Sequence, residues 1–232
     1  MASRPFVPSS TIAGLLLPAA LFCASGPNPA GPVIIERPIS FSAERERMTL
    51  LYIQRHIDPE AQAITIEPRM VVIHWTGTAD LESAFRIFDE ERAPRERWLL
   101  YQAGAVNVSA HFLIDRDGSI YRLMPETILA RHCIGLNHLA IGIENVGGPE
   151  SPLTAGQLAA NAALVRDLKR RFPQIETLIG HHEHNQLRTS SLFREREPGY
   201  RTEKIDPGEN FMRALRVRLK DLGLSDARSR TR

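Results

Sequence analysis

The chain has 232 residues, of which 43% are hydrophobic and 24% are charged, as in an ordinary globular protein with one good-sized core. Its 29 basic and 27 acidic residues give a formal net charge of +2. No long block carries a single sign of charge apart from the short C-terminal stretch DARSRTR, which excludes the basic footprint of a nucleic-acid-binding protein. We therefore expect a single catalytic domain with no nucleic-acid partner.

The first 25 residues differ in composition from the rest of the chain. Arg4 precedes an apolar run at 11–22, and small residues follow at 23–26. This pattern is typical of a secretory signal, whereas a membrane span needs roughly 20 apolar residues. We expect residues 1–25 to be an export signal and the protein to have no membrane span. A disordered leader that stays attached is the alternative.

Only two cysteines are present, Cys23 and Cys133, so a processed chain would hold one thiol and no internal disulfide. Cys133 fits a buried small hydrophobe better than a nucleophile. A free thiol and an export signal of bacterial type favour the periplasm as the location of the exported protein. Secretion and a lipid anchor on Cys23 are the alternatives.

Next come an arm and a first helix. Residues 26–41 are rich in Pro and Gly near their start and are predicted to form an extended N-terminal arm, before a folded domain at 42–224. The domain opens with a helix over 41–57, with Ser42 as N-cap. The apolar residues that recur at helical spacing in it are Met48, Leu51, Tyr52 and Ile57.

Strands and helices alternate over the rest of the domain. Buried strands are predicted within 69–78, 138–148 and 175–181, and helices within 80–91, 158–172 and 206–224. Asp117 and Gly118 predict a hairpin, and Thr154 with Gln157 predicts a capping box. Residues 225–232 are predicted to be a charged tail. The order of elements predicts one α/β domain with a central mixed β-sheet flanked by helices.

Three of these strands end in a polar residue whose side chain can bind a metal or transfer a proton: His74, Glu144 and His181. Strand ends at one edge of an α/β sheet are a common place for a site. Lys204 and Asp206 form a fourth cluster in a loop before the last helix. Two imidazoles and one carboxylate make a catalytic type of zinc site, with the fourth position left for water.

The remaining groups would fill the other roles of a hydrolase. A carboxylate outside the ligand set, such as Glu144, can move the proton of the water, and a lysine can stabilise an oxyanion. Each residue also has a structural explanation, because strand-end histidines often only hydrogen-bond and DPG is a normal helix entry. Spacing alone does not decide between the two.

The order of five motifs over roughly residues 70–215 carries a family resemblance. The motifs are VVIHWT, VSAHFLIDRDGSIYRL, RHCIGLNHLAIGIEN, LIGHHE and EKIDPGENF. In this order they resemble the zinc-dependent N-acetylmuramoyl-L-alanine amidases of type 2, which share their fold with peptidoglycan recognition proteins. The resemblance implies hydrolysis of the amide that joins the lactyl group of N-acetylmuramic acid to L-alanine of the stem peptide. The substrate would be peptidoglycan or its fragments. Nothing in the sequence demands a dimer, so we expect a monomer.

The resemblance also implies residue roles. The Zn²⁺ ligands it implies are His74, His181 and Asp206, and the catalytic residues it implies are Glu144 and Lys204. His132 falls where the family often has a histidine that lines the cleft, which suggests a substrate contact. His111 is expected to be a packed strand residue. Ala110 stands where some relatives have a catalytic tyrosine, which favours chemistry by Glu144 and Lys204.

Two features of the LIGHHEHNQL segment qualify this assignment. His181 and His182 are neighbours that would point to opposite faces of a strand, so we expect His181 to be the only ligand from this segment. The 22 residues at 182–203 form a longer connection than in many relatives and are expected to supply a wall of the cleft.

Two alternatives remain at this point. One is a non-catalytic peptidoglycan-binding module on the same fold, which typically lacks part of the ligand set. The other is a structural α/β protein whose histidines only hydrogen-bond, and it predicts no metal.

Overall fold

The computed structural model describes Met1 and residues 31–230, so the expected export signal lies, apart from Met1, outside the described residues. The described part contains a six-stranded sheet in the order β1-β4-β3-β5-β2-β6. The strands are β1 (Ile34–Glu36), β2 (Met70–Ile73), β3 (Phe112–Ile114), β4 (Ile120–Arg122), β5 (Ala140–Asn145) and β6 (Thr177–Gly180). Only β3 and β4 pair antiparallel in this sheet, so the predicted mixed sheet is confirmed.

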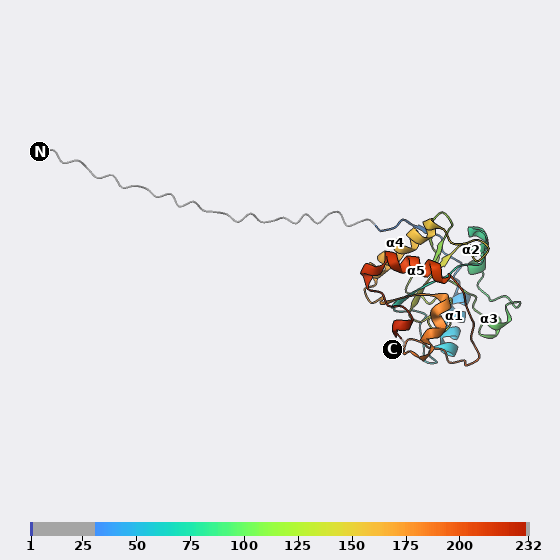
Figure 1. The fold of residues 1–232 in the computed structure, drawn as a ribbon. Helices are drawn as coiled ribbons and strands as arrows, with labels where there is room; N and C mark the ends of the chain where they lie inside the picture. Colours follow the sequence, from blue (N-terminus) through green and yellow to red (C-terminus); the bar gives the residue numbers. More distant parts are fainter. Residues whose placement is uncertain (2–30, 231–232) are drawn as a thin grey trace. The chain divides into compact units, whose positions relative to one another are not determined.

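Helices cover both faces of the sheet (Figure 1). They are α1 (Ala43–His56), α2 (Leu81–Asp89), α3 (Trp98–Gln102), α4 (Ala155–Arg171) and α5 (Glu209–Arg218), with 3₁₀ helices η1 (His181–Thr189), η2 (Lys220–Leu222) and η3 (Arg228–Arg230). Apolar side chains of α4 and α5 share one core cluster with alternate residues of β2, β3 and β5. None of the helices within residues 31–230 is long and apolar enough to cross a membrane.

Local sequence signals set several of these boundaries. Ser42 accepts the backbone N–H of Arg45 and caps α1, while Thr154 and Gln157 form the predicted capping box of α4. Gly118 adopts a φ of 94° in the hairpin between β3 and β4, a conformation that costs glycine little. One detail of the α1 prediction is wrong: Leu51 is 50% exposed.

The two ends of the domain differ from the prediction. Part of the expected extended arm is strand β1, in which Ile34 pairs with Ile120 of β4. The C-terminal segment is not a loose tail over its described length, because Ser225 donates to the carbonyl of Glu176 and Ala227 is fully buried. Both segments are held by distant parts of the chain, which a local sequence pattern does not reveal.

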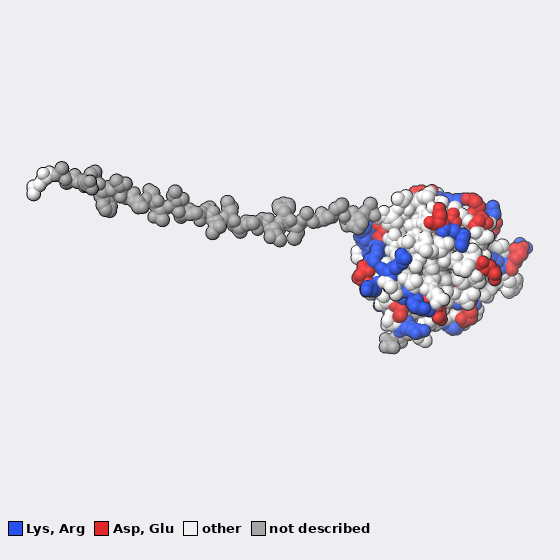
Figure 2. Space-filling view, turned by 45° about the horizontal axis from the view of Figure 1, so that its top comes forward, with Lys and Arg blue, Asp and Glu red and all other residues white. Residues whose placement is uncertain are grey.

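Acidic and basic side chains are interspersed over the face of the molecule in Figure 2. This face therefore shows no continuous basic surface of the kind that binds nucleic acid.

Candidate active site

The sheet register brings three polar strand-end residues into one row. Strand β2 lies between β5 and β6, and Ile73 is paired with both Ile143 and Gly180. The residues that follow these three in the chain are His74, Glu144 and His181. Because side chains alternate along strands, these three project from the sheet face opposite α4 and α5.

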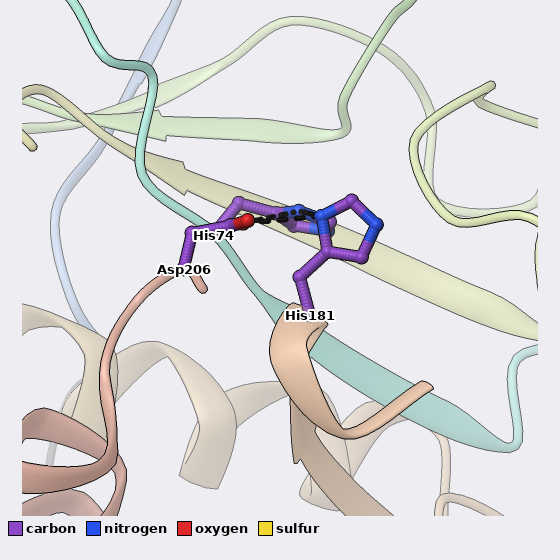
Figure 3. Close-up of side chains that lie close together, drawn as sticks. All are labelled: His74, His181 and Asp206. Carbon is purple, nitrogen blue, oxygen red and sulfur yellow. Dashed lines mark hydrogen bonds and ion pairs between the residues drawn. The ribbon is translucent and has the colours of Figure 1, made fainter. Parts of the chain in front are cut away.

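Asp206 completes the cluster from the loop before α5, and Figure 3 shows its carboxylate directed at the two imidazoles. The Nδ1 atoms of His74 and His181 are 2.9 Å apart. Asp206 Oδ2 lies 3.3 Å from Nδ1 of His74 and 3.1 Å from Nδ1 of His181. All three residues are buried.

This donor set fits a small divalent cation. Ligand bonds of about 2.0–2.2 Å in a tetrahedron place neighbouring donor atoms roughly 3.3 Å apart, close to the distances observed. Burial and the nearby His74 lower the pKa of His181 to about 3, so its ring is neutral near pH 7. Burial opposes ionisation of Asp206, but the neighbouring imidazoles of His181 and His74 hold its pKa below the ordinary value. Neutral imidazoles and an anionic carboxylate are the forms that bind metal.

The other histidines of the LIGHHEHNQL segment lie outside the cluster. The backbone N–H and the ring Nδ1 of His182 both contact the carbonyl oxygen of Asp206, at 2.9 Å and 3.0 Å. His184 Nδ1 lies 2.8 Å from the carbonyl oxygen of His181. His182 therefore holds the loop that carries Asp206, and His184 holds the start of η1.

Glu144 lies beside this cluster in a water-poor setting. It is 8% exposed, and its Oε2 atom has no hydrogen-bond partner among the described residues. Burial and the charge of Asp206 raise the pKa of Glu144 well above its ordinary value, although Lys204 and Arg97 oppose this shift. A carboxyl group with a raised pKa can both accept and release a proton near neutrality.

Two cavities open next to the row. One has a volume of about 590 Å³ and is lined by residues that include His74, Glu144, His181, Lys204 and Asp206. The structure thus brings all five predicted ligand and catalytic residues to one cavity.

The other cavity, of about 320 Å³, lies between α3 and the 182–203 connection. Trp98 lines it from α3, and Tyr200 and Thr202 line it from the 182–203 connection. Arg97 lines both cavities. Sequence reasoning missed Arg97 and Trp98, because α3 has only five residues and no apolar period marks it.

His132 lies between the two cavities, where its Nδ1 atom is 3.0 Å from Nε2 of His74. Burial and the neighbouring His74 and His111 lower the pKa of His132 well below its ordinary value. Whether His132 also contacts substrate stays a prediction. His111 is a packed residue, as expected, with its ring nitrogens paired to backbone groups of Gly142 and Ile128. Cys133 is buried, as expected.

Comparison with known proteins places this site in a family. A family model described as N-acetylmuramoyl-L-alanine amidase matches residues 65–209. An endolysin of Enterobacteria phage K11 is 27% identical over 88 residues, which are 35% of this chain and 58% of that protein. The chain thus spans less than two thirds of the length of this curated relative.

Solved structures show the same fold. The endolysin N-acetylmuramoyl-L-alanine amidase LysCS from Clostridium intestinale URNW has a TM-score of 0.51 at 22% identity, covering 82% of this chain and 97% of its own. A selenomethionine derivative of AmpD has a TM-score of 0.50 at 22% identity, covering 83% and 94%. With the family match over most of the folded part, this chain belongs to the N-acetylmuramoyl-L-alanine amidase family.

Proposed function

We propose that this protein is a zinc-dependent hydrolase that cleaves the amide between the lactyl group of N-acetylmuramic acid and L-alanine in peptidoglycan or its fragments. The observation that carries the proposal is the convergence of three donor atoms, from His74, His181 and Asp206, beside the buried carboxyl group of Glu144. Membership of the amidase family supplies the bond that is cleaved.

Zinc would be held by His74, His181 and Asp206. When bound, the ion supplies Lewis-acid polarisation and makes a water molecule more acidic. Glu144 accepts a proton from the attacking water, whose oxygen bonds to the amide carbon. The same carboxyl group then delivers that proton to the amine nitrogen of L-alanine as the carbon–nitrogen bond breaks. Lys204, which lines the same cavity, stabilises the negative charge on the carbonyl oxygen.

The complete set of groups favours an enzyme over a non-catalytic binding module on the same fold. The ligands, the proton carrier and the lysine all line one cavity of about 590 Å³. A module that only binds peptidoglycan needs neither a buried carboxyl group with a raised pKa nor a metal cluster beside it.

The decisive experiment incubates the zinc-loaded protein with a defined muropeptide and identifies the products by mass. We expect a free stem peptide that begins with L-alanine and a sugar that keeps its lactyl carboxylate. Glu144→Gln should bind zinc stoichiometrically and release no peptide.

Two histidine variants test the ligand assignment by metal analysis. His181→Ala should lose zinc, and the matched neighbour variant His182→Ala should keep it. A wild-type protein that binds no zinc and releases no peptide would refute the proposal. The reverse result for the two histidines would move the ligand by one residue and leave the function standing.

We also propose that the protein is exported to the periplasm, on the basis of the composition of residues 1–25. Fractionation of cells that express the full chain, with N-terminal sequencing of the product, tests this. An uncleaved protein in the cytoplasmic fraction would contradict it.

A further inference from the structure

The ring of His132 connects a metal-cluster histidine to the backbone of the sheet. Its Nδ1 atom lies 3.0 Å from Nε2 of His74, and its own Nε2 atom lies 3.1 Å from the carbonyl oxygen of Ala140 in β5. His74 therefore uses one nitrogen toward the cluster and the other toward His132.

These contacts determine where the protons are. A backbone carbonyl only accepts hydrogen bonds, so Nε2 of His132 must carry a proton. In a neutral imidazole the other nitrogen is then an acceptor, and Nε2 of His74 has to donate to it. The remaining nitrogen of His74, Nδ1, then carries no proton, and it lies 2.9 Å from Nδ1 of His181 and 3.3 Å from Oδ2 of Asp206.

The ring of His132 is also confined by packing. A Cβ atom added at Gly142 would lie 2.7 Å from the ring, so only glycine lets the imidazole rest on β5 at this position. On another side the ring meets His111 edge-on, with the ring centroids 6.0 Å apart. The glycine of the AIGIE segment thus makes room for this histidine.

We propose that His132 is a positioning residue that fixes the tautomer and orientation of His74, so that Nδ1 of His74 is ready to bind the metal ion. The consequence for metal affinity rests on the proposed zinc-dependent function, whereas the tautomer of His74 does not. The role is assigned to a contact with a metal ligand, which differs from the substrate contact expected from sequence.

Two substitutions at position 132 separate hydrogen bonding from packing. His132→Phe keeps a flat ring but removes the acceptor, whereas His132→Asn restores an oxygen near the place of Nδ1. We expect zinc affinity, measured by competition with a chromophoric chelator, to fall about 10- to 100-fold in the Phe variant and to recover largely in the Asn variant. His138→Phe is the control, because His138 is a partly buried histidine outside the cluster, and it should bind zinc as the wild type does.

A second measurement needs neither zinc nor substrate. Two-dimensional ¹⁵N–¹H NMR of the metal-free protein, with signals of His74 assigned through His74→Gln, should show a proton on Nε2 in the wild type and in His132→Asn. His132→Phe should show a mixture of tautomers, while thermal unfolding confirms that each variant is folded.

Equal zinc affinity and an unchanged tautomer in His132→Phe would overturn the inference. A wild type that binds no zinc would instead refute the proposed function, and the NMR result would still decide whether His132 sets the tautomer of His74.

Discussion

At position 144 a carboxyl group is held where its charged form is disfavoured. The pKa of Glu144 is raised by burial and by Asp206, so the ionised side chain costs folding free energy once the pH exceeds the pKa of the unfolded chain. The group contributes its full share to stability in acid and loses it as the pH rises through the higher folded-state pKa. The proposed role of Glu144 in proton transfer therefore comes at a cost to the stability of the folded protein above neutral pH.

Replacing this carboxyl group with an amide should separate the two demands. Metal-free Glu144→Gln should be more stable than the metal-free wild type at pH 8, by on the order of 1 kcal/mol, because the neutral amide avoids the desolvation cost of a buried charge and the repulsion from Asp206. The difference should disappear toward pH 4, where the wild-type side chain is neutral. Urea unfolding across this pH range measures it, and a difference that grows in acid would contradict the raised pKa.

The positions of His74, Glu144 and His181 could be predicted because each lies at the end of an apolar run that predicts a strand, whereas Asp206 in its loop is identified by the order of the family motifs. The hydrogen bond between His132 and His74 could not be predicted, since it joins residues 58 positions apart through ring orientation. The same holds for Arg97, whose position at both cavities depends on a loop with no sequence signature.

At the scale of elements, local chemistry at the start of α4 makes a measurable contribution. Thr154 accepts the backbone N–H of Gln157, and the Gln157 side chain accepts the backbone N–H of Thr154. Thr154→Ala should lower the free energy of unfolding by about 1 kcal/mol in urea titrations. Thr154→Ser keeps the hydroxyl and is the control. An equal loss in both variants would mean that the methyl group, not the cap, matters.

Within β5, the space above Gly142 provides a second test. Gly142→Ala would bring a methyl group to 2.7 Å from the His132 ring, so the ring has to move. We expect a loss of about 1–3 kcal/mol of stability from overpacking, together with weaker zinc binding. Gly199→Ala is the matched control, because nothing lies within 4 Å of its added Cβ. Unchanged stability and metal affinity in Gly142→Ala would show that the sheet and the His132 ring can shift to accommodate the methyl group without cost.

An element could be predicted from the sequence when its stabilising contacts lie within the element itself or next to it. Helix α4 and the hairpin at Asp117 and Gly118 carry their own caps and turn residues, so a short window of sequence suffices. Strand β1 and the C-terminal segment gain their hydrogen bonds from β4 and from the region of β6, more than 45 residues away in each case. Local patterns hold no information about such partners.

At the scale of the whole molecule, Arg131 joins both walls of the smaller cavity. Its buried guanidinium donates to the carbonyl groups of Leu100 and Gly104 around α3 and to the hydroxyl of Tyr200 in the 182–203 connection. It also lies over the ring of Tyr52 from α1, 4.7 Å from the centroid. One side chain thereby links three segments that are far apart in sequence.

Removing this guanidinium should loosen the cavity walls together. Arg131→Met should cost about 2–4 kcal/mol of stability, because several buried acceptors lose a charged donor. Hydrogen exchange should rise both around α3 and near Tyr200. Faster exchange in one wall alone would show that the two walls are held independently, and Arg95→Met, at an exposed position, is the control.

The position of β2 between β5 and β6 has a consequence for how the protein folds. His74 and His181 are 107 residues apart, and they meet only after β2 has paired with a strand that follows it by about a hundred residues. Such long-range parallel pairing is late and slow, because closing the long loop between the two strands costs conformational entropy before any contact compensates for it. Zinc should therefore slow unfolding and leave the refolding rate unchanged in stopped-flow experiments. The reason is that the ion can bind only after folding has brought its proposed ligands together. The amount of zinc bound per chain would then report the fraction of chains that have folded correctly.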